Sequence, residues 1–130
     1  MYQHNPKTFR ASGTIAQNTF VAITSGGLVK TAGADDAPIG VAVLPAASAG
    51  NWTTVDLLSK GGTMQVVAGG SVSAGDKLAP DSAGKAVSAT SSGGVYGIAL
   101  QGGSSGAIIE VMPVCMQAAT VTVVSSGGQS

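Results

Sequence analysis

Short segments of the chain alternate large apolar side chains with glycine, alanine or polar residues. In residues 39–43 and 96–100 the large side chains occupy every second position, and residues 53–57 and 109–111 are further candidate strands. Successive side chains of a β-strand point to opposite faces of a sheet, so a period of two residues indicates strands. Helical periodicity has no comparable support, because Gly, Ser, Thr and Val predominate and no long periodic segment follows a helix cap. The pattern therefore predicts an all-β protein.

The strand pattern occurs twice, because the sequence contains an internal duplication. Residues 13–58 align with residues 70–114 at an offset of 57 residues, which becomes 56 after one deletion. The alignment keeps both the glycines and the large apolar positions in phase, and Gly40 for example falls on Gly97. Composition alone would not keep both kinds of residue in phase. We therefore expect a β-sandwich or barrel over residues 13–114, built from two copies of one β-unit.

The turn residues repeat together with the strands. Asp81-Ser82-Ala83-Gly84 has Asp at the first and Gly at the fourth position, as a type I turn prefers, and its counterpart is residues 24–27. Asn18 aligns with Gly75, and both residue types tolerate a positive φ. Two different residues that meet one backbone requirement indicate a structural duplication.

Three segments lie outside the two copies. Residues 1–12 hold two of the five aromatic and two of the six basic residues, and we expect them to form an extended N-terminal arm with no core to join. Residues 59–69 connect the copies, and residues 64–67 within this connector are a further candidate strand. Residues 115–130 are expected to form a C-terminal tail, in which residues 120–124 are strand-like.

Charge and composition exclude several classes of partner. The 130 residues include 6 Lys+Arg and 6 Asp+Glu, so the net charge is zero and 9% of the residues are charged, against roughly 25% in an ordinary soluble domain. A neutral chain lacks the electrostatic footprint expected for nucleic acid or an anionic membrane. With 44% hydrophobic residues and a mean hydropathy of +0.35, a free monomer would expose much apolar surface. We therefore expect a permanent assembly.

The sequence predicts neither an export signal nor a membrane span. Residues 1–13 lack the continuous apolar region of a signal peptide, and no apolar run approaches the ~20 residues that span a bilayer. A single cysteine cannot form an internal disulfide. We expect intracellular synthesis and no membrane partner.

Residues with reactive side chains are scarce. His4, Cys115 and Trp52 are each the only residue of their type, which deprives catalytic and metal chemistry of its usual groups. Residues 102–106 match G-x-S-x-G, but they lie between two predicted strands and the only histidine is in the arm, so we interpret Ser104 as a loop residue. The six carboxylates contain no D-x-D-x-D-G run typical of calcium loops. We predict no catalytic residue, no metal and no cofactor.

The arm and the single tryptophan supply the candidate contact residues. We expect Tyr2 and Phe9 to act as aromatic anchors, and Lys7 and Arg10 as charge contacts, on a neighbouring subunit; a loose terminus is the alternative. Trp52, at the start of a strand, fits a packing or oligomer contact better than a sugar-stacking platform. The complete set of candidate contacts is Tyr2, His4, Lys7, Phe9, Arg10 and Trp52.

Three stretches of the second copy carry a resemblance to a known family. They are Gly-Ser-Val-Ser-Ala-Gly-Asp-Lys-Leu at 70–78, Asp-Ser-Ala-Gly-Lys-Ala-Val at 81–87 and Gly-Val-Tyr-Gly-Ile-Ala-Leu at 94–100. This sequence resembles the capsid cement (decoration) proteins of tailed bacteriophages, and the first copy resembles them through residues 38–42. Gln-Asn-Thr at 17–19 departs from the Ala-Gly-Asp of the second copy.

The resemblance, which covers residues 13–114, implies a compact β-sandwich or barrel subunit that is usually a homotrimer. It implies a protein made in the host cytoplasm that sits on the outer surface of the virion capsid, where it staples adjacent major capsid proteins. The family is structural and has no catalytic residues to carry over. The alternative function is a receptor- or glycan-binding β-domain of a phage tail or surface adhesin, which the shortage of aromatic residues disfavours. A serine hydrolase acting through Ser104 is a distant third hypothesis.

Overall fold

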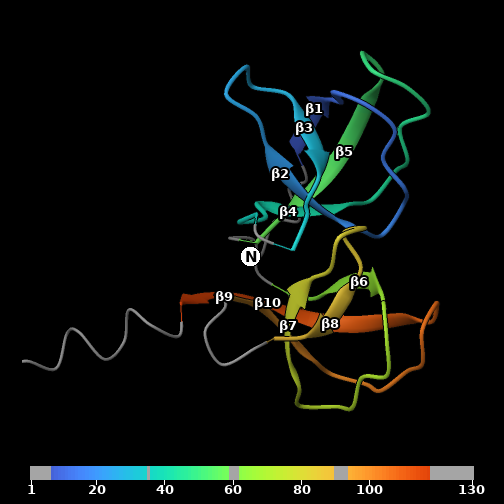
Figure 1. Cartoon of the computed structure of the whole chain (residues 1–130), viewed down its shortest axis with the longest axis vertical. Coiled ribbons are helices and arrows are strands. Elements are labelled where there is room, and N and C mark those ends of the chain that lie inside the picture. The colour runs from blue at the N-terminus through green and yellow to red at the C-terminus, as the bar shows by residue number, and fades with distance from the viewer. Residues whose placement is uncertain (1–6, 35, 59–61, 90–93, 118–130) are drawn as a thin grey trace, which may run out of the picture.

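The computed structural model describes residues 7–34, 36–58, 62–89 and 94–117, with the backbone alone for residues 115–117. These residues form ten β-strands and no helix (Figure 1), which confirms the all-β prediction. The strands are β1 (Lys7–Arg10), β2 (Phe20–Ile23), β3 (Val29–Thr31), β4 (Gly40–Ala42), β5 (Trp52–Leu57), β6 (Met64–Val67), β7 (Lys77–Pro80), β8 (Ala86–Ser88), β9 (Gly94–Ala99) and β10 (Ile108–Gln117).

The strands form two five-stranded antiparallel sheets, one from each half of the chain. The first sheet has the order β1-β5-β4-β2-β3 and the second has the order β6-β10-β9-β7-β8, which is the same order shifted by five strands. In Figure 1 the first sheet, blue to green, lies above the second, and the two pack against each other as a sandwich. The duplication in the sequence is therefore a duplication of structure.

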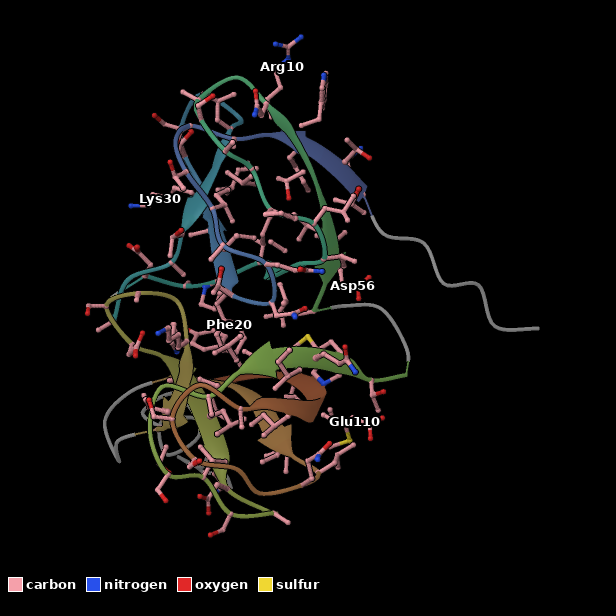
Figure 2. The ribbon with its side chains drawn as sticks, turned by 90° about the vertical axis from the view of Figure 1, so that its right-hand side faces the viewer. Arg10, Phe20, Lys30, Asp56 and Glu110 are labelled. Atoms are coloured by element: carbon pink, nitrogen blue, oxygen red, sulfur yellow. The ribbon has the colours of Figure 1, made fainter. Side chains whose placement is uncertain are left out.

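Two hydrophobic clusters form the core. The first lies within the first sheet and contains Ala11, Ile15, Val21, Val29, Ala42, Ala46 and Val55. The second joins ten buried residues of the second sheet to four residues of the first, which are Phe20, Ala22, Ala32 and Val41. Phe20 and Val21 are consecutive in one strand, so they face opposite sides of the first sheet. That sheet is thus buried on both faces, and Figure 2 shows Phe20 at the junction of the two sheets.

The paired positions of Asn18 and Gly75 confirm the predicted backbone requirement. Asn18 has a φ of 64° and Gly75 has a φ of 91°. The N–H of Asn18 donates to Ala42 O, and the N–H of Gly75 donates to Ala99 O, in both repeats at 2.7 Å. Asparagine and glycine are the residues that adopt this left-handed conformation at least cost.

The predicted turn at residues 81–84 and its counterpart at 24–27 connect β7 to β8 and β2 to β3. The N–H of Gly84 donates to Asp81 O at 3.1 Å, and the N–H of Gly27 donates to Thr24 O at 3.0 Å. Both glycines have a positive φ, of 77° and 84°. The Asp81 carboxylate accepts two backbone N–H groups of its own turn, as turn-initiating Asp residues do.

The N-terminal arm is shorter than the sequence suggested. Residues 7–10, placed in the arm by the sequence, form β1 and pair with β5, and Ala11 is completely buried in the first cluster. The sequence pattern does not reveal this strand, because Phe9 is the one large apolar side chain in it and charged residues flank it, so the alternation is too short to detect. The candidate strand at residues 64–67 is present as β6, and β1 is its counterpart in the first repeat.

The described residues stop short of both ends of the chain. Residues 1–6 and the predicted strand at 120–124 lie outside the described residues, while β10 continues to Gln117. Within the described part, no helix has the length and apolar character needed to cross a membrane.

Candidate functional site

An exposed pair of a cation and an aromatic ring stands at the far end of the first sheet. Arg10 of β1 and Trp52 of β5 are direct cross-strand partners, and the guanidinium carbon lies 4.6 Å from the centroid of the indole ring. Trp52 is 58% exposed. Figure 2 shows Arg10 at the tip of the molecule, away from the junction marked by Phe20. The pair is a rigid amphipathic projection of the kind that anchors protein interfaces.

The register of β1 on β5 explains why these two side chains meet. Ala11 donates its N–H to Asn51 O and accepts the N–H of Gly50, both at 2.8 Å. The next pair along the ladder, Arg10 and Trp52, is therefore a non-hydrogen-bonded pair, in which the side chains approach most closely. Stacking on the indole holds the guanidinium in place before any partner arrives.

Two threonines complete this surface. Thr8 and Thr54 are the next cross-strand pair on the same side of the sheet, two residues from Arg10 and Trp52. Thr8 is exposed and Thr54 is half-buried. We call the surface of Thr8, Arg10, Trp52 and Thr54 the β1–β5 face. The two threonines were missed in the sequence because only the strand register brings them beside the tryptophan.

The other arm residues are placed differently. Lys7 and Phe9 point to the opposite side of β1, where Phe9 is half-buried against the first core cluster. The Lys7 Nζ lies 5.8 Å from the centroid of the Phe9 ring. Phe9 therefore contributes to the core of its own chain and does not join Arg10 and Trp52. Tyr2 and His4 lie outside the described residues.

The second repeat has no equivalent of the Arg10–Trp52 pair. In the aligned positions Val67 of β6 lies opposite Ile108 of β10. Ile108 is exposed, and Leu100 and Met112 of the second repeat are exposed as well. These three exposed apolar side chains of the second repeat are not among the contacts predicted from the sequence.

The G-x-S-x-G sequence forms a tight turn between β9 and β10. The N–H of Ala107 donates to Ser104 O at 2.9 Å, and Gly106 has a φ of 91°. In the first repeat, the N–H of Asn51 donates to Ser48 O in the same way. A nucleophile elbow joins a strand to a helix, whereas this turn joins two strands, so the geometry agrees with the interpretation of Ser104 as a loop residue.

The carboxylates in the loops serve the turns in which they lie. Asp36 Oδ2 accepts the N–H of Gly33 at 2.8 Å and lies 3.4 Å from Lys30 Nζ. The hydrogen bond from Gly33 lowers the pKa of Asp36, burial opposes this shift, and the hydrogen bond and charge of Lys30 lower the pKa further. Asp76 and Asp81 also accept backbone N–H groups nearby in sequence. Across the described ranges, no three His, Cys, Asp or Glu side chains gather as a metal ion would require.

Comparison with known proteins agrees with this architecture. The N base of the head fiber gp8.5 of bacteriophage phi29 is similar in structure, with a TM-score of 0.72 and 23% sequence identity over 87% of this chain and 96% of that chain. At this level of identity the likeness shows the shared fold. No curated protein sequence matches the chain.

The family assignment comes from the sequence itself. A family model described as phage cement protein matches residues 3–114, which include both sheets up to the middle of β10. The match extends beyond the duplicated segment at its N-terminal side and takes in β1. This chain belongs to the phage cement protein family.

Proposed function

We propose that this protein binds the outer surface of a phage head and staples adjacent major capsid proteins. Membership of the cement family gives the chain a structural role in the phage capsid. The observation that carries the finer proposal is that the family match spans both repeats, so the decorating unit is the whole sandwich and not one part of it. A rigid body with surfaces on two repeats can contact two capsid subunits at once.

The β1–β5 face is our candidate for the capsid contact. Trp52 and Arg10 are the residue types that most often dominate binding energy in protein interfaces, and their stacking limits the entropy lost on docking. Lys7 points to the opposite side of β1 and remains a predicted charge contact, whose charge would affect the association rate more than the affinity. Tyr2 and His4 remain predicted contacts that precede β1 in the chain.

The exposed apolar residues of the second repeat support self-association. Leu100, Ile108 and Met112 are each more than two-fifths exposed, and Glu110 is a charged residue on the same side of β10, between Ile108 and Met112. Burying apolar surface is the main driving force of stable assembly. We therefore propose a homotrimer as the form that binds the head.

The glycan-binding alternative gains nothing from the geometry of the tryptophan. Arg10 covers one side of the indole ring, which leaves a single side for stacking against a sugar. No further exposed aromatic ring stands beside Trp52 among the described residues. We retain the cement function.

Electron microscopy of phage heads tests the proposed function. Purified protein is added to expanded heads that lack it, and the decorated and bare heads are compared. The expected result is new density on the outer shell, bridging neighbouring capsid subunits. Density confined to the tail, or an undecorated shell at saturating protein, would contradict the proposal.

A further inference from the structure

The outer edge of β1 is an open strand edge. In the first sheet β1 pairs with β5 and is the terminal strand. Ala11 directs both its backbone groups towards residues 50 and 51, and backbone groups alternate in direction along a strand. The N–H and C=O groups of Thr8 and the N–H of Arg10 therefore point away from β5, whereas Ala11, which follows β1, forms a parallel bridge with Val29 of β3. Such a row of groups is a template for another strand.

The other three terminal strands of the sheets each make at least one backbone hydrogen bond on their outward side. At β3, the N–H of Ser12 donates to Val29 O at 2.8 Å, and at β8 the N–H of Gly69 donates to Ala86 O at 2.7 Å. At β6, the N–H of Val67 donates to Asn18 O of the first repeat at 2.8 Å. Within the part of the chain that the structure describes, the outward groups of Thr8 in β1 meet no such bond, while Ala11, directly after β1, forms a parallel bridge with Val29 of β3.

The sequence of the C-terminal tail repeats that of β6, the first strand of the second repeat. At the same offset of 57 residues, β6 and its flanks at 63–70 align with residues 120–127. The two segments read Thr-Met-Gln-Val-Val-Ala-Gly-Gly and Thr-Val-Thr-Val-Val-Ser-Ser-Gly, with identical residues at four of the eight positions. Residues 8–13 of the first repeat agree with this tail segment at Thr8, Ser12 and Gly13.

This tail segment has no vacant place beside its own β10. In each repeat the opening strand pairs with the last strand, β1 with β5 and β6 with β10. Strand β10 is already paired on both sides, with β6 and with β9. Strand β5 is likewise paired on both sides, with β1 and with β4. A tail segment with the sequence of the first strand of a repeat must therefore pair with a strand other than β5 or β10.

We propose that residues 120–124 of one copy add as a strand to the open edge of β1 in a second copy. Three residues separate Gln117 from Val121, a reach of no more than about 14 Å. Strand β10 ends beside Gly94 in the second sheet, and Figure 1 shows β1 in the upper part of the first sheet. The arrangement thus favours the tail of a neighbour over the chain's own tail.

The contact would close a ring. Each copy offers one edge and one tail, so the same contact repeated around an axis saturates every copy. Addition of a strand uses backbone groups and leaves the side chains of the β1–β5 face free, so it is compatible with capsid binding. The proposal rests on the self-association proposed above and specifies the contact.

Proline variants of the full chain test the edge and the tail separately. Thr8→Pro removes an outward N–H without touching the bonds of β1 to β5, and Thr8→Ala is its matched control. Val123→Pro would prevent the proposed strand pairing of the tail. Residue 123 is outside the described residues, and Val123→Ala is the matched control. We expect each proline variant to weaken self-association roughly tenfold or more in analytical ultracentrifugation, while both alanine controls keep it.

Mixing the two proline variants gives the sharper result. The Val123→Pro chain keeps an intact β1 edge and the Thr8→Pro chain keeps an intact tail, so the mixture should form dimers that neither variant forms alone. Undiminished assembly in both proline variants would overturn the tail contact and leave the homotrimer standing. Loss of assembly in Thr8→Pro alone would show that another segment occupies the edge, and a monomeric parent chain would remove both proposals.

Discussion

The two repeats share one backbone framework and differ in which side chains are buried on one face of the sheet. Ile15 and Ala46 exchange two hydrogen bonds at 2.9 Å, and Val72 and Gly103 do the same in the second repeat. Phe20 and Lys77, however, are aligned in the sequence, and the first is completely buried while the second is exposed.

The difference between Phe20 and Lys77 shows that both repeats form the same sheet with different side chains on this face. Turns, positive-φ positions and core alternation are common to both copies, and these local features build the sheet. The outer face of the first sheet is apolar because the second repeat covers it, and the equivalent face of the second repeat carries Lys77 where no such partner lies. This face is therefore buried within the chain in the first repeat and exposed in the second.

The largest expected effect separates Phe20 from Lys77. Phe20→Ala should lower the free energy of unfolding by about 3–5 kcal/mol, because it removes a buried ring from the junction and leaves a cavity. Lys77→Ala should change it by less than about 0.5 kcal/mol. Urea unfolding measures the free energy of unfolding of both variants. Equal losses would contradict the difference in burial between Phe20 and Lys77.

The next largest difference is expected between alanine substitutions at the two turn glycines, Gly84 and Gly27. Each has a positive φ, so alanine costs about 1–2 kcal/mol in either turn. A Cβ at Gly84 would also lie 2.8 Å from Thr31 Cγ2 and 2.9 Å from Phe20 O, whereas one at Gly27 would meet open space. Thermal unfolding should therefore show a greater loss for Gly84→Ala than for Gly27→Ala, and the reverse order would argue against packing of this turn on the first sheet.

Asn18 offers a smaller test with an internal control. Asn18→Ala should cost about 1 kcal/mol because alanine tolerates a φ of 64° poorly. Asn18→Gly should be close to neutral, since glycine already occupies the equivalent position at 75. If the two variants unfold at the same urea concentration, the backbone conformation is not what selects asparagine here.

The smallest effect concerns pH and the loop of the first repeat. The pKa of Asp36 is lowered in the folded chain by the N–H of Gly33 and the charge of Lys30. Its contribution is thus present above the ordinary aspartate pKa, about 4, and is lost as the pH falls through the lower folded value. Asp36→Asn should flatten this acid limb of the stability curve slightly, because the side chain is one-third exposed and screened by solvent.

Local signals made much of this fold predictable. The strand alternation, the duplication, the paired positions Asn18 and Gly75 and the turn at 81–84 all depend on neighbouring residues. Strand β1 was hidden because charged residues flank Phe9. The burial of Phe20 was also hidden, because it depends on a sheet formed by residues more than 40 positions away.

The candidate contact surface was predictable in part. Arg10 and Trp52 stood out by their chemistry, but their stacking follows from the register of β1 on β5, which joins residues far apart in sequence. Phe9 has the chemistry of an anchor and yet packs inwards. Deletion of residues 1–12 would consequently remove a strand and a buried alanine, so single substitutions test the surface more cleanly.

The most direct test of the account is a titration of undecorated phage heads with Trp52→Ala and with Ile23→Ala. Both residues are exposed apolar side chains of the first sheet, but Trp52 alone belongs to the β1–β5 face. We expect Trp52→Ala to bind about thirtyfold more weakly, equivalent to about 2 kcal/mol, and Ile23→Ala to bind like the parent chain. Unchanged binding of Trp52→Ala, with the fold intact by its melting transition, would contradict the assignment of this face to the capsid.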